Sequence, residues 1–437
     1  MSQLIIYSPA ELKSTIGDDE GAVLVSLADF GHIPYGHTIV GQVVFLEENA
    51  DGCEDFGESL RGYDDPNPIV IVERGNCTFV QKVRNVEHGG GKMAIIVDEL
   101  DNENVKYVVM VDDGTGNGIF IPSAMMNKGP GNKIIEYFRN NNEEHTKQVK
   151  FVMGFKINNP DNHVEYDLLL STYQDRALDF VSEFKPYHER LGKSVTMTPH
   201  YFSWPCFGCD DEIKKQDCYG NGKYCAVDYQ DLMINGTQIL DSNIRQKCVY
   251  KYSIEKTGSD SLWWNYVNKA HSFCYKDFTE DCSKAVHSRV GISWKDTQKC
   301  LENSFTNKGT ADEDNTILGE DYEYWVEGGF SFTPAVIIND VRYKGDMAPD
   351  FVYEAICSGF NTPPDVCKSS LLYEESIGSK HVTFNWFLFI TIILVILNII
   401  LAAICIRRNK TQLKTHVFSA LGKYTKLDRG RNSDVTQ

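Results

Sequence analysis

Short apolar runs alternate with glycine-rich turns along the first third of the chain. Five runs are rich in β-branched residues and predict strands at 22–28, 39–46, 68–73, 93–98 and 106–111. Between the third and fourth runs, residues 76–88 have the length of a helix and end at three glycines, a common helix stop. The order strand, helix, strand indicates an α/β domain whose sheet wraps around its own core.

The pattern changes after residue 155. Residues 158–162 read as a linker, and the next run predicts a strand followed by an amphipathic helix. Residues 194–203 predict another strand, and a helical, cysteine-bearing stretch covers about 250–305. The chain therefore combines α/β and α+β patterns.

One uninterrupted apolar run lies near the C-terminus. Residues 386–406 carry no charge over 21 positions, and a helix of that length spans about 31 Å, the thickness of a bilayer core. Arg407, Arg408 and Lys410 follow directly, so the positive-inside rule places residues 407–437 in the cytosol. We predict a single transmembrane helix, preceded by a linker at 368–383, and a type I topology.

Charge and cysteine content agree with that topology. The tail holds eight of the 43 Lys and Arg and two of the 61 Asp and Glu, so the rest of the chain carries a net charge of −24. Such an acidic ectodomain argues against nucleic acid as a partner. Twelve of the 13 cysteines precede the membrane segment, an even number that predicts disulfides in an oxidising compartment. Asn76 and Asn235 begin glycosylation triplets.

The first residues, MSQLIIYSPAELK, lack the basic start and long apolar run of a signal peptide. Because the topology requires a translocated N-terminus, we expect a processed or shortened start.

The sharpest chemical motif is Cys206-Phe207-Gly208-Cys209, which lies between a predicted strand and a predicted helix. This is the arrangement of thioredoxin, in which a helix N-terminus lowers the pKa of the first thiol. The segment around Pro334 looks like the proline that faces the thioredoxin disulfide. One hypothesis is thus a thiol–disulfide oxidoreductase with Cys206 as nucleophile and Cys209 as resolving thiol. A purely structural disulfide is the alternative, and zinc is disfavoured because no second pair has suitable spacing.

The N-terminal third resembles a protease-associated (PA) domain. The resemblance rests on residues 71–79 (IVERGNCTF), 91–96 (GKMAII) and 121–125 (IPSAM), and it implies a non-catalytic ligand-binding module over 1–155. Arg74, with Gly75 and Asn76, lies at a strand-to-helix turn and is the candidate ligand site. The alternative for Arg74 is an ion pair with Glu73 or solvation. Cys53 and Cys77 are the only cysteines of this domain, so we expect them to pair.

The central part resembles the ectodomain of vacuolar sorting receptors. The signatures occur in one order, at 198–204, 222–226, Asn243 with Arg245, 248–250, 263–267 and 355–360. The resemblance implies a cysteine-rich, thioredoxin-like domain over 165–367. The EGF-like repeats that plant members carry before the membrane do not occur in this sequence, and plant members lack the second cysteine of the Cys-x-x-Cys motif.

The tail contains Tyr424-Thr425-Lys426-Leu427, a Tyr-x-x-Φ motif that an adaptor can bind as an added strand. Together with the family resemblance, it predicts a vacuolar or lysosomal sorting receptor of the Golgi, trans-Golgi network and endosomes. Soluble hydrolases would be its cargo, and clathrin adaptors would bind Tyr424 and Leu427. The competing hypothesis is the membrane-tethered oxidoreductase. We predict no cofactor and no metal.

Overall fold

The computed structural model describes residues 3–16, 18, 20–60, 65–102, 105, 108–226, 234–330 and 333–368. These residues all belong to one compact unit, Met1–Ser369. Within the described ranges, none of the helices combines the length and the apolar content needed to cross a bilayer. The predicted membrane segment 386–406 and the motif at Tyr424 and Leu427 lie outside those ranges.

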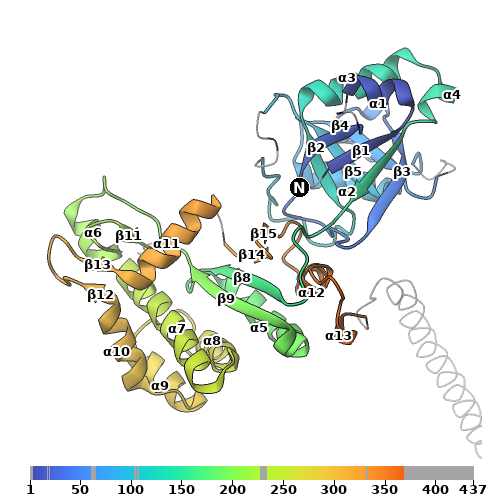
Figure 1. The fold of residues 1–437 in the computed structure, drawn as a ribbon. Coiled ribbons are helices and arrows are strands. Elements are labelled where there is room, and N and C mark those ends of the chain that lie inside the picture. The colour runs from blue at the N-terminus through green and yellow to red at the C-terminus, as the bar shows by residue number, and fades with distance from the viewer. Residues whose placement is uncertain are drawn as a thin grey trace, which may run out of the picture. The chain divides into compact units, whose positions relative to one another are not determined.

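The N-terminal part is a closed barrel of seven strands in the order β1-β2-β6-β5-β4-β3-β7 (Figure 1). Strands β3 to β6 pair in parallel, and the other pairs are antiparallel. The strands are β1 Gln3–Ser8, β2 Ala22–Leu27, β3 Thr38–Val44, β4 Ile69–Glu73, β5 Met93–Val97, β6 Ser123–Met126 and β7 Lys150–Gly154. The helices of this part are α1 Ala10–Ile16, η1 Glu47–Asn49, α2 Phe79–Gly89, α3 Lys128–Asn140 and α4 Glu143–Thr146.

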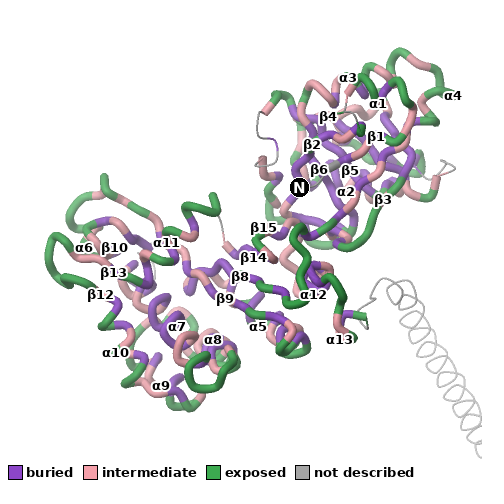
Figure 2. Tube along the Cα trace, in the orientation of Figure 1, coloured by how far each residue is buried: buried purple, intermediate pink, exposed green. Residues whose placement is uncertain are grey.

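Strands β4 and β5 are buried on both faces, which explains their continuous apolar sequence. Ile69 and Ile71 point into the barrel core, whereas Val70 and Val72 pack in a second cluster with α2. Figure 2 shows this burial along the barrel strands. Four of the five predicted strands thus form. The run at 106–111 does not: its described residues, 108–111, are irregular, and Val111 is exposed.

The central part contains a mixed four-stranded sheet in the order β15-β14-β8-β9. Strand β8 pairs in parallel with β9 and antiparallel with β14. The strands are β8 Val164–Leu170, β9 Val195–Tyr201, β14 Ala335–Ile338 and β15 Val341–Arg342. The helices adjoining this sheet in sequence are α5 Asp175–Leu191, η3 Gly192–Ser194, α11 Thr316–Gly328, α12 Pro349–Ser358 and α13 Asp365–Lys368.

A helical segment is inserted between β9 and α11 (Figure 1). Its elements are α6 Asp211–Asp217, β10 Cys218–Tyr219, β11 Tyr224–Cys225, α7 Gly236–Thr257, α8 Ser261–Phe273, α9 Glu280–Val290, α10 Trp294–Ser304, β12 Phe305–Thr306 and β13 Asp314–Asn315. The helices of this segment begin at Asp211, earlier than the helical stretch at about 250–305 that the sequence indicated. Disulfides fix this part at Cys206–Cys209, Cys218–Cys225, Cys248–Cys300 and Cys274–Cys282, and Cys357–Cys367 joins α12 to α13.

The segment after β14 contacts the barrel. The Gly345 N–H donates to the Ala28 carbonyl at 2.8 Å, and the Asp346 N–H donates to the Gly31 carbonyl at 2.9 Å. Asp29 of the barrel lies between Arg342, at 3.2 Å, and Lys344, at 3.0 Å. Residues more than 300 positions apart in sequence therefore form one polar contact.

Candidate functional site

The candidate ligand loop, residues 74–78, joins the C-terminal end of β4 to the N-terminus of α2. Gly75 and Asn76 have φ angles of 111° and 63°, in the left-handed region that glycine and, less readily, asparagine adopt. The Thr78 hydroxyl caps α2 by accepting a hydrogen bond from the Gln81 N–H at 3.2 Å. The local sequence therefore determines both the turn and the start of the helix.

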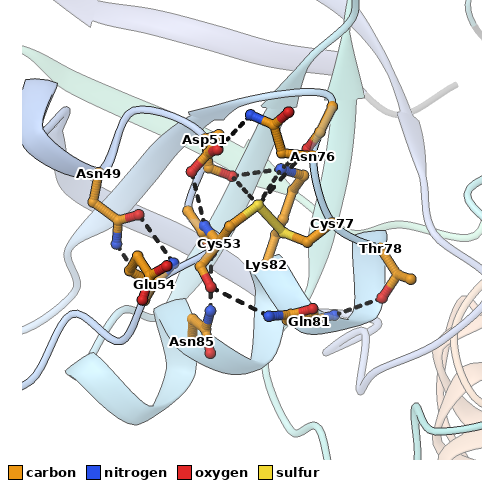
Figure 3. The surroundings of a disulfide bond; sticks show 12 residues. Asn49, Asp51, Cys53, Glu54, Asn76, Cys77, Thr78, Gln81, Lys82 and Asn85 are labelled. Carbon is orange, nitrogen blue, oxygen red and sulfur yellow. Dashed lines mark hydrogen bonds between the residues drawn. A yellow bond between two sulfur atoms is a disulfide. The ribbon is translucent and has the colours of Figure 1, made fainter.

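Covalent and polar contacts hold the ligand loop from below (Figure 3). Cys77 forms a disulfide with Cys53, the pair expected from the sequence. The Asn76 amide donates to the Asp51 carboxylate at 2.8 Å. The Lys82 ammonium, fully buried on α2, donates to the Asp51 carbonyl at 2.5 Å and to the Gly75 carbonyl at 2.6 Å. A buried cation thus stabilises the turn at its centre.

Burial and hydrogen bonding shift the pKa values of Lys82 and Asp51 beneath the ligand loop. Burial lowers the pKa of Lys82, and the nearby carboxylates of Asp51 and Glu73 partly oppose that shift. The hydrogen bonds from the Asn76 amide and the Cys53 N–H lower the pKa of Asp51. The ionised form of Asp51 is therefore favoured beneath the loop.

Arg74 is paired, but with neither partner considered from the sequence. Its Nη1 lies 2.8 Å from Oδ1 of Asp98, whose side chain is only 1% exposed, while the Arg74 side chain is 41% exposed. The guanidinium also lies 5.3 Å from the Phe79 ring centre. One edge of Arg74 is therefore fixed by a buried carboxylate, and the rest faces solvent, where a peptide carbonyl or carboxylate can reach it.

Sequence reasoning missed Asp98, although a signal was present. Glu73 of β4 pairs with Val97 of β5 in a parallel register, so the residues that follow each strand, Arg74 and Asp98, must be neighbours. The structure brings Arg74, Gly75 and Asn76 together with Cys53, Cys77 and this unforeseen carboxylate.

The second candidate site differs from the thioredoxin arrangement. Cys206 and Cys209 form a disulfide, but α6 begins only at Asp211 and is capped by the Asp210 side chain. The Cys206 N–H donates instead to the Gly222 carbonyl, in the turn between β10 and β11. Cys206 therefore lacks the helix N-terminus that would stabilise a thiolate, and three carboxylates follow it at 210–212.

Pro334 is placed by β14 and the chain that precedes it. The Thr333–Pro334 peptide bond is cis, and the Gln174 amide donates to the Thr333 carbonyl at 2.9 Å. The contacts of the Cys206–Cys209 disulfide, by contrast, run to the β10–β11 hairpin, where Trp204 pairs with Cys225.

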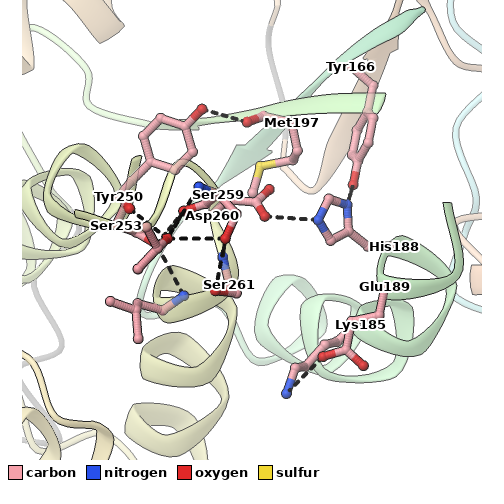
Figure 4. A network of polar contacts seen from close by, with 12 residues as sticks. Tyr166, Lys185, His188, Glu189, Met197, Tyr250, Ser253, Ser259, Asp260 and Ser261 are labelled. Carbon is pink, nitrogen blue, oxygen red and sulfur yellow. Dashed lines mark hydrogen bonds and ion pairs between the residues drawn. The ribbon is translucent and has the colours of Figure 1, made fainter. Parts of the chain in front are cut away.

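Two buried polar networks lie around the central sheet. In the first, the Tyr166 hydroxyl is 2.7 Å from Nδ1 of His188, whose Nε2 is 3.0 Å from the Asp260 carboxylate (Figure 4). In the second, the Asp321 carboxylate lies 2.6 Å from the Lys247 ammonium and 3.0 Å from Nδ1 of His200. Neither was found from the sequence, because each joins residues distant in sequence.

The glycosylation candidates have different surroundings. Asn235 is exposed and begins α7, where its side chain forms a capping box with Gln238. Asn76 is also exposed, but its side-chain amide is bonded to Asp51 on the ligand loop. In the described part of the chain, no group of three or more His, Cys, Asp and Glu side chains is arranged to hold a metal ion.

Two family descriptions match the chain. "Vacuolar sorting receptor thioredoxin-like domain" matches residues 164–357, and "PA domain" matches residues 39–134. The first covers the central sheet with its helical segment, and the second covers the barrel strands that carry the ligand loop.

Curated relatives extend over both parts. Vacuolar-sorting receptor 1 of Pisum sativum is 28% identical over 397 residues, which are 84% of this chain and 61% of that protein. Vacuolar-sorting receptor 4 of Arabidopsis thaliana is 29% identical over 402 residues, with the same coverage of each. The chain thus spans about three fifths of the length of these relatives. Among solved structures, oxidised DsbA of Mycobacterium tuberculosis is 10% identical, covering 48% of this chain and 89% of that one with a TM-score of 0.29, a likeness that supports no argument.

Proposed function

The chain belongs to the vacuolar sorting receptor family, and from this premise we propose that it binds sorting peptides of soluble hydrolases in the Golgi lumen. The observation that carries the proposal is the ligand loop: Arg74 is half exposed on a turn that a disulfide and the buried Lys82 hold rigid. A preorganised loop loses little conformational entropy when a peptide binds.

The chemistry of the loop supports an extended peptide as ligand. Arg74 presents guanidinium N–H groups to solvent beside the N-terminus of α2, and both attract carbonyl or carboxylate oxygens. The Glu99 carboxylate lies 3.2 Å from the point that a Cβ on Gly75 would occupy, so the loop also has a hydrogen-bond acceptor beside it. A short peptide with both hydrogen-bond donors and acceptors would match the ligand loop.

The next parts of the proposal concern the membrane topology, the cytosolic tail and the domain limits. We infer a single transmembrane helix at 386–406 and a type I topology in the Golgi, trans-Golgi network and endosomes. Tyr424 and Leu427 would then bind clathrin adaptors from the cytosol. The domain limits 1–155 and 165–367 belong to the same proposal.

The test is a pull-down of soluble luminal proteins on the immobilised full chain at pH 7, followed by elution at pH 5. We expect hydrolases to bind at neutral pH, and we expect Arg74→Gln to weaken binding about tenfold, as loss of a charge-assisted contact does. Equal capture by the wild type and Arg74→Gln would contradict the proposed site.

Arg139→Gln is the matched control. Arg139 lies on the same barrel, is 44% exposed and pairs with Glu47 at 2.7 Å and with Glu73 at 3.7 Å. Its replacement therefore removes a comparable surface charge that is not part of residues 74–78. A Cys206→Ser/Cys209→Ser variant should bind cargo normally. If clients instead accumulate as mixed disulfides on a Cys209→Ser variant, the chain is an oxidoreductase.

A further inference from the structure

A groove of about 590 Å³ lies on the helical part of the central domain. Helices α5, α8 and α9 form its walls, and its polar side chains are Ser182 and Lys185 of α5, Asn265, Asn268, Lys269 and Ser272 of α8, and Arg289 of α9. Val290 completes the lining. Three cations, two amides and two hydroxyls thus face one space, and no carboxylate is among the described residues that line it.

The cationic groove stands out against the charge of the chain. The protein as a whole carries −18, whereas residues 236–304, from which two of the three walls come, contain ten Lys and Arg and eight Asp and Glu, a net charge of +2. An anion in solution would therefore be repelled by most of the surface and attracted to this part.

The cations of the groove are partly held in place. Lys185 donates to the Asn265 side chain at 2.8 Å and lies 3.4 Å from Glu189, an exposed residue one turn along α5 (Figure 4). The Arg289 guanidinium lies 4.0 Å from the Phe273 ring centre. In the described part of the chain, neither Lys269 nor Arg289 has a carboxylate within ion-pair distance.

The walls themselves are fixed relative to one another. His188 of α5 is hydrogen bonded to Asp260, the residue before α8, at 3.0 Å, and its ring stacks on Trp264 of α8 at 4.8 Å. The Tyr266 hydroxyl of α8 is hydrogen bonded to the Ser283 hydroxyl of α9 at 2.7 Å. The three cations are therefore carried by helices that do not need to rearrange before a ligand binds, which lowers the cost of binding.

We propose that this groove binds a phosphate or sulfate ester. The three cations approach from three different helices, and a tetrahedral oxyanion presents several oxygens in different directions, whereas a carboxylate presents two in one plane. The groove is larger than an inorganic oxyanion, so it has room for an attached sugar, whose hydroxyls would meet Ser182, Ser272 and Asn268. The site is separate from the ligand loop and goes beyond the proposed cargo binding.

The experiment is isothermal titration of the full chain at pH 7.4 and low salt with glucose 6-phosphate, glucose 6-sulfate and glucose as the uncharged control. We expect saturable binding of at least one ester with a dissociation constant on the order of 1 mM or below. Binding should weaken as ionic strength rises, since the site is open to solvent.

Variants connect the binding to the groove. Lys269→Gln and Arg289→Gln should each weaken binding about three- to tenfold, and the double variant should remove it. Lys251→Gln is the matched control, because Lys251 is an exposed lysine on α7 that pairs with Glu320 at 3.5 Å outside the groove. Positions 251, 269 and 289 are exposed or half-buried, so the melting temperature of each variant should stay within about 2 °C of the wild type.

Repeating the titration at pH 5 separates the two esters. A phosphate monoester loses about half of its charge below its second pKa of about 6, so its affinity should fall several-fold, whereas a sulfate ester keeps its charge and its affinity. Either pattern supports the proposal and identifies the source of the oxyanion. No saturable binding of any ester, or binding that survives the double variant, overturns it and leaves a set of solvated cations.

Discussion

His287 shows how a single residue can make this fold sensitive to acid. Its imidazole is fully buried on α9, with Nδ1 2.8 Å from the Ser283 carbonyl and Nε2 3.1 Å from the Thr297 hydroxyl. Burial lowers the pKa of His287, the bond to Ser283 partly opposes the shift, and the charge of Arg245 adds to it. The neutral form is therefore the one that the folded state holds.

The sign of the pH effect follows. Because the folded pKa lies below the ordinary value of about 6.5, the unfolded chain takes up the proton first as the pH falls. The contribution of His287 to stability is complete above pH 6.5 and is lost as the pH falls towards the folded pKa. We predict that the wild type loses more unfolding free energy between pH 7 and pH 5 than His287→Gln does, by an amount on the order of 1 kcal/mol.

Urea unfolding at both pH values measures this difference directly. His88→Gln, at an exposed position on α2, is the control and should change with pH as the wild type does. An identical pH dependence in the wild type and His287→Gln would show that the buried imidazole does not contribute.

At the scale of elements, strand β9 shows how an open sheet edge is closed by side chains. The Tyr250 hydroxyl donates to the Met197 carbonyl at 2.7 Å, the Lys247 ammonium donates to the Pro199 carbonyl at 2.7 Å, and the Tyr201 N–H donates to Asp321 at 3.0 Å. Helices α7 and α11 thereby take the place of a fifth strand, and the edge is protected from pairing with another chain.

Asp321 is the centre of this closure. Burial raises its pKa, but the hydrogen bond from His200 and the charge of Lys247 outweigh that effect, so the pKa of Asp321 lies below its usual value. We predict that Asp321→Asn costs about 3–5 kcal/mol of unfolding free energy at pH 7, because it leaves the Lys247 ammonium buried without a counter-charge.

Denaturant unfolding tests this prediction together with a double variant. Asp321→Asn/Lys247→Met should be more stable than the sum of the single effects indicates, since it removes both charges. Glu320→Gln, at the exposed neighbouring position, should stay within about 0.5 kcal/mol of the wild type. A carboxyl group whose folded pKa is depressed contributes its full stability above the unfolded pKa of about 3.9 and loses it as the pH falls below that value. The Asp321–Lys247 pair should therefore still stabilise the fold at pH 5. A large loss of its stabilising free energy by pH 5 would contradict the assignment.

The same scale shows what local sequence can predict. Strands β2, β3, β4 and β5 were predictable because each is an apolar run bounded by turn residues, and helix α2 was predictable from its length and the glycines at its end. Strands β1 and β7 were not, because they pair with each other across almost 150 residues, Leu4 opposite Met153. The apolar run at 106–111 was predicted as a strand, but its described residues, 108–111, form none. There the Val108 and Met110 carbonyls each accept a single hydrogen bond, from the Ser26 hydroxyl and the Asp29 N–H.

Part of the candidate site could likewise be predicted from the sequence, and part could not. Arg74, Gly75 and Asn76 could be chosen from the motif, and the Cys53–Cys77 disulfide from the number of cysteines. The burial of Lys82 and the pairing of Arg74 with Asp98 depend on the parallel register of β4 and β5 and on the packing of α2 against them, which no single segment specifies. Cys206 and Cys209 lie between β9 and α6, in the predicted order, but α6 starts two residues after Cys209, so its N-terminus does not lie at Cys206.

At the scale of the molecule, Asp29 links the barrel to the central domain. Its carboxylate lies 3.2 Å from the Arg342 guanidinium and 3.0 Å from the Lys344 ammonium, and all three side chains are at most 20% exposed. Burial lowers the pKa of Lys344, and the charge of Asp29 opposes that shift. One carboxylate of the barrel thus interacts with two cations of the central domain.

We predict that Asp29→Asn costs about 2–4 kcal/mol of unfolding free energy, because the Lys344 ammonium, only 14% exposed, loses the carboxylate it pairs with and Arg342 loses one of its contacts. The backbone hydrogen bonds of Gly345 and Asp346 remain in this variant. It should also separate the unfolding of the two domains, so that calorimetry resolves two transitions where the wild type gives one cooperative transition. Glu47→Gln removes an exposed ion pair with Arg139 whose two partners both belong to the N-terminal domain, so this variant should still unfold in a single transition. A single transition and a loss below about 0.5 kcal/mol in Asp29→Asn would mean that the backbone contacts alone couple the domains.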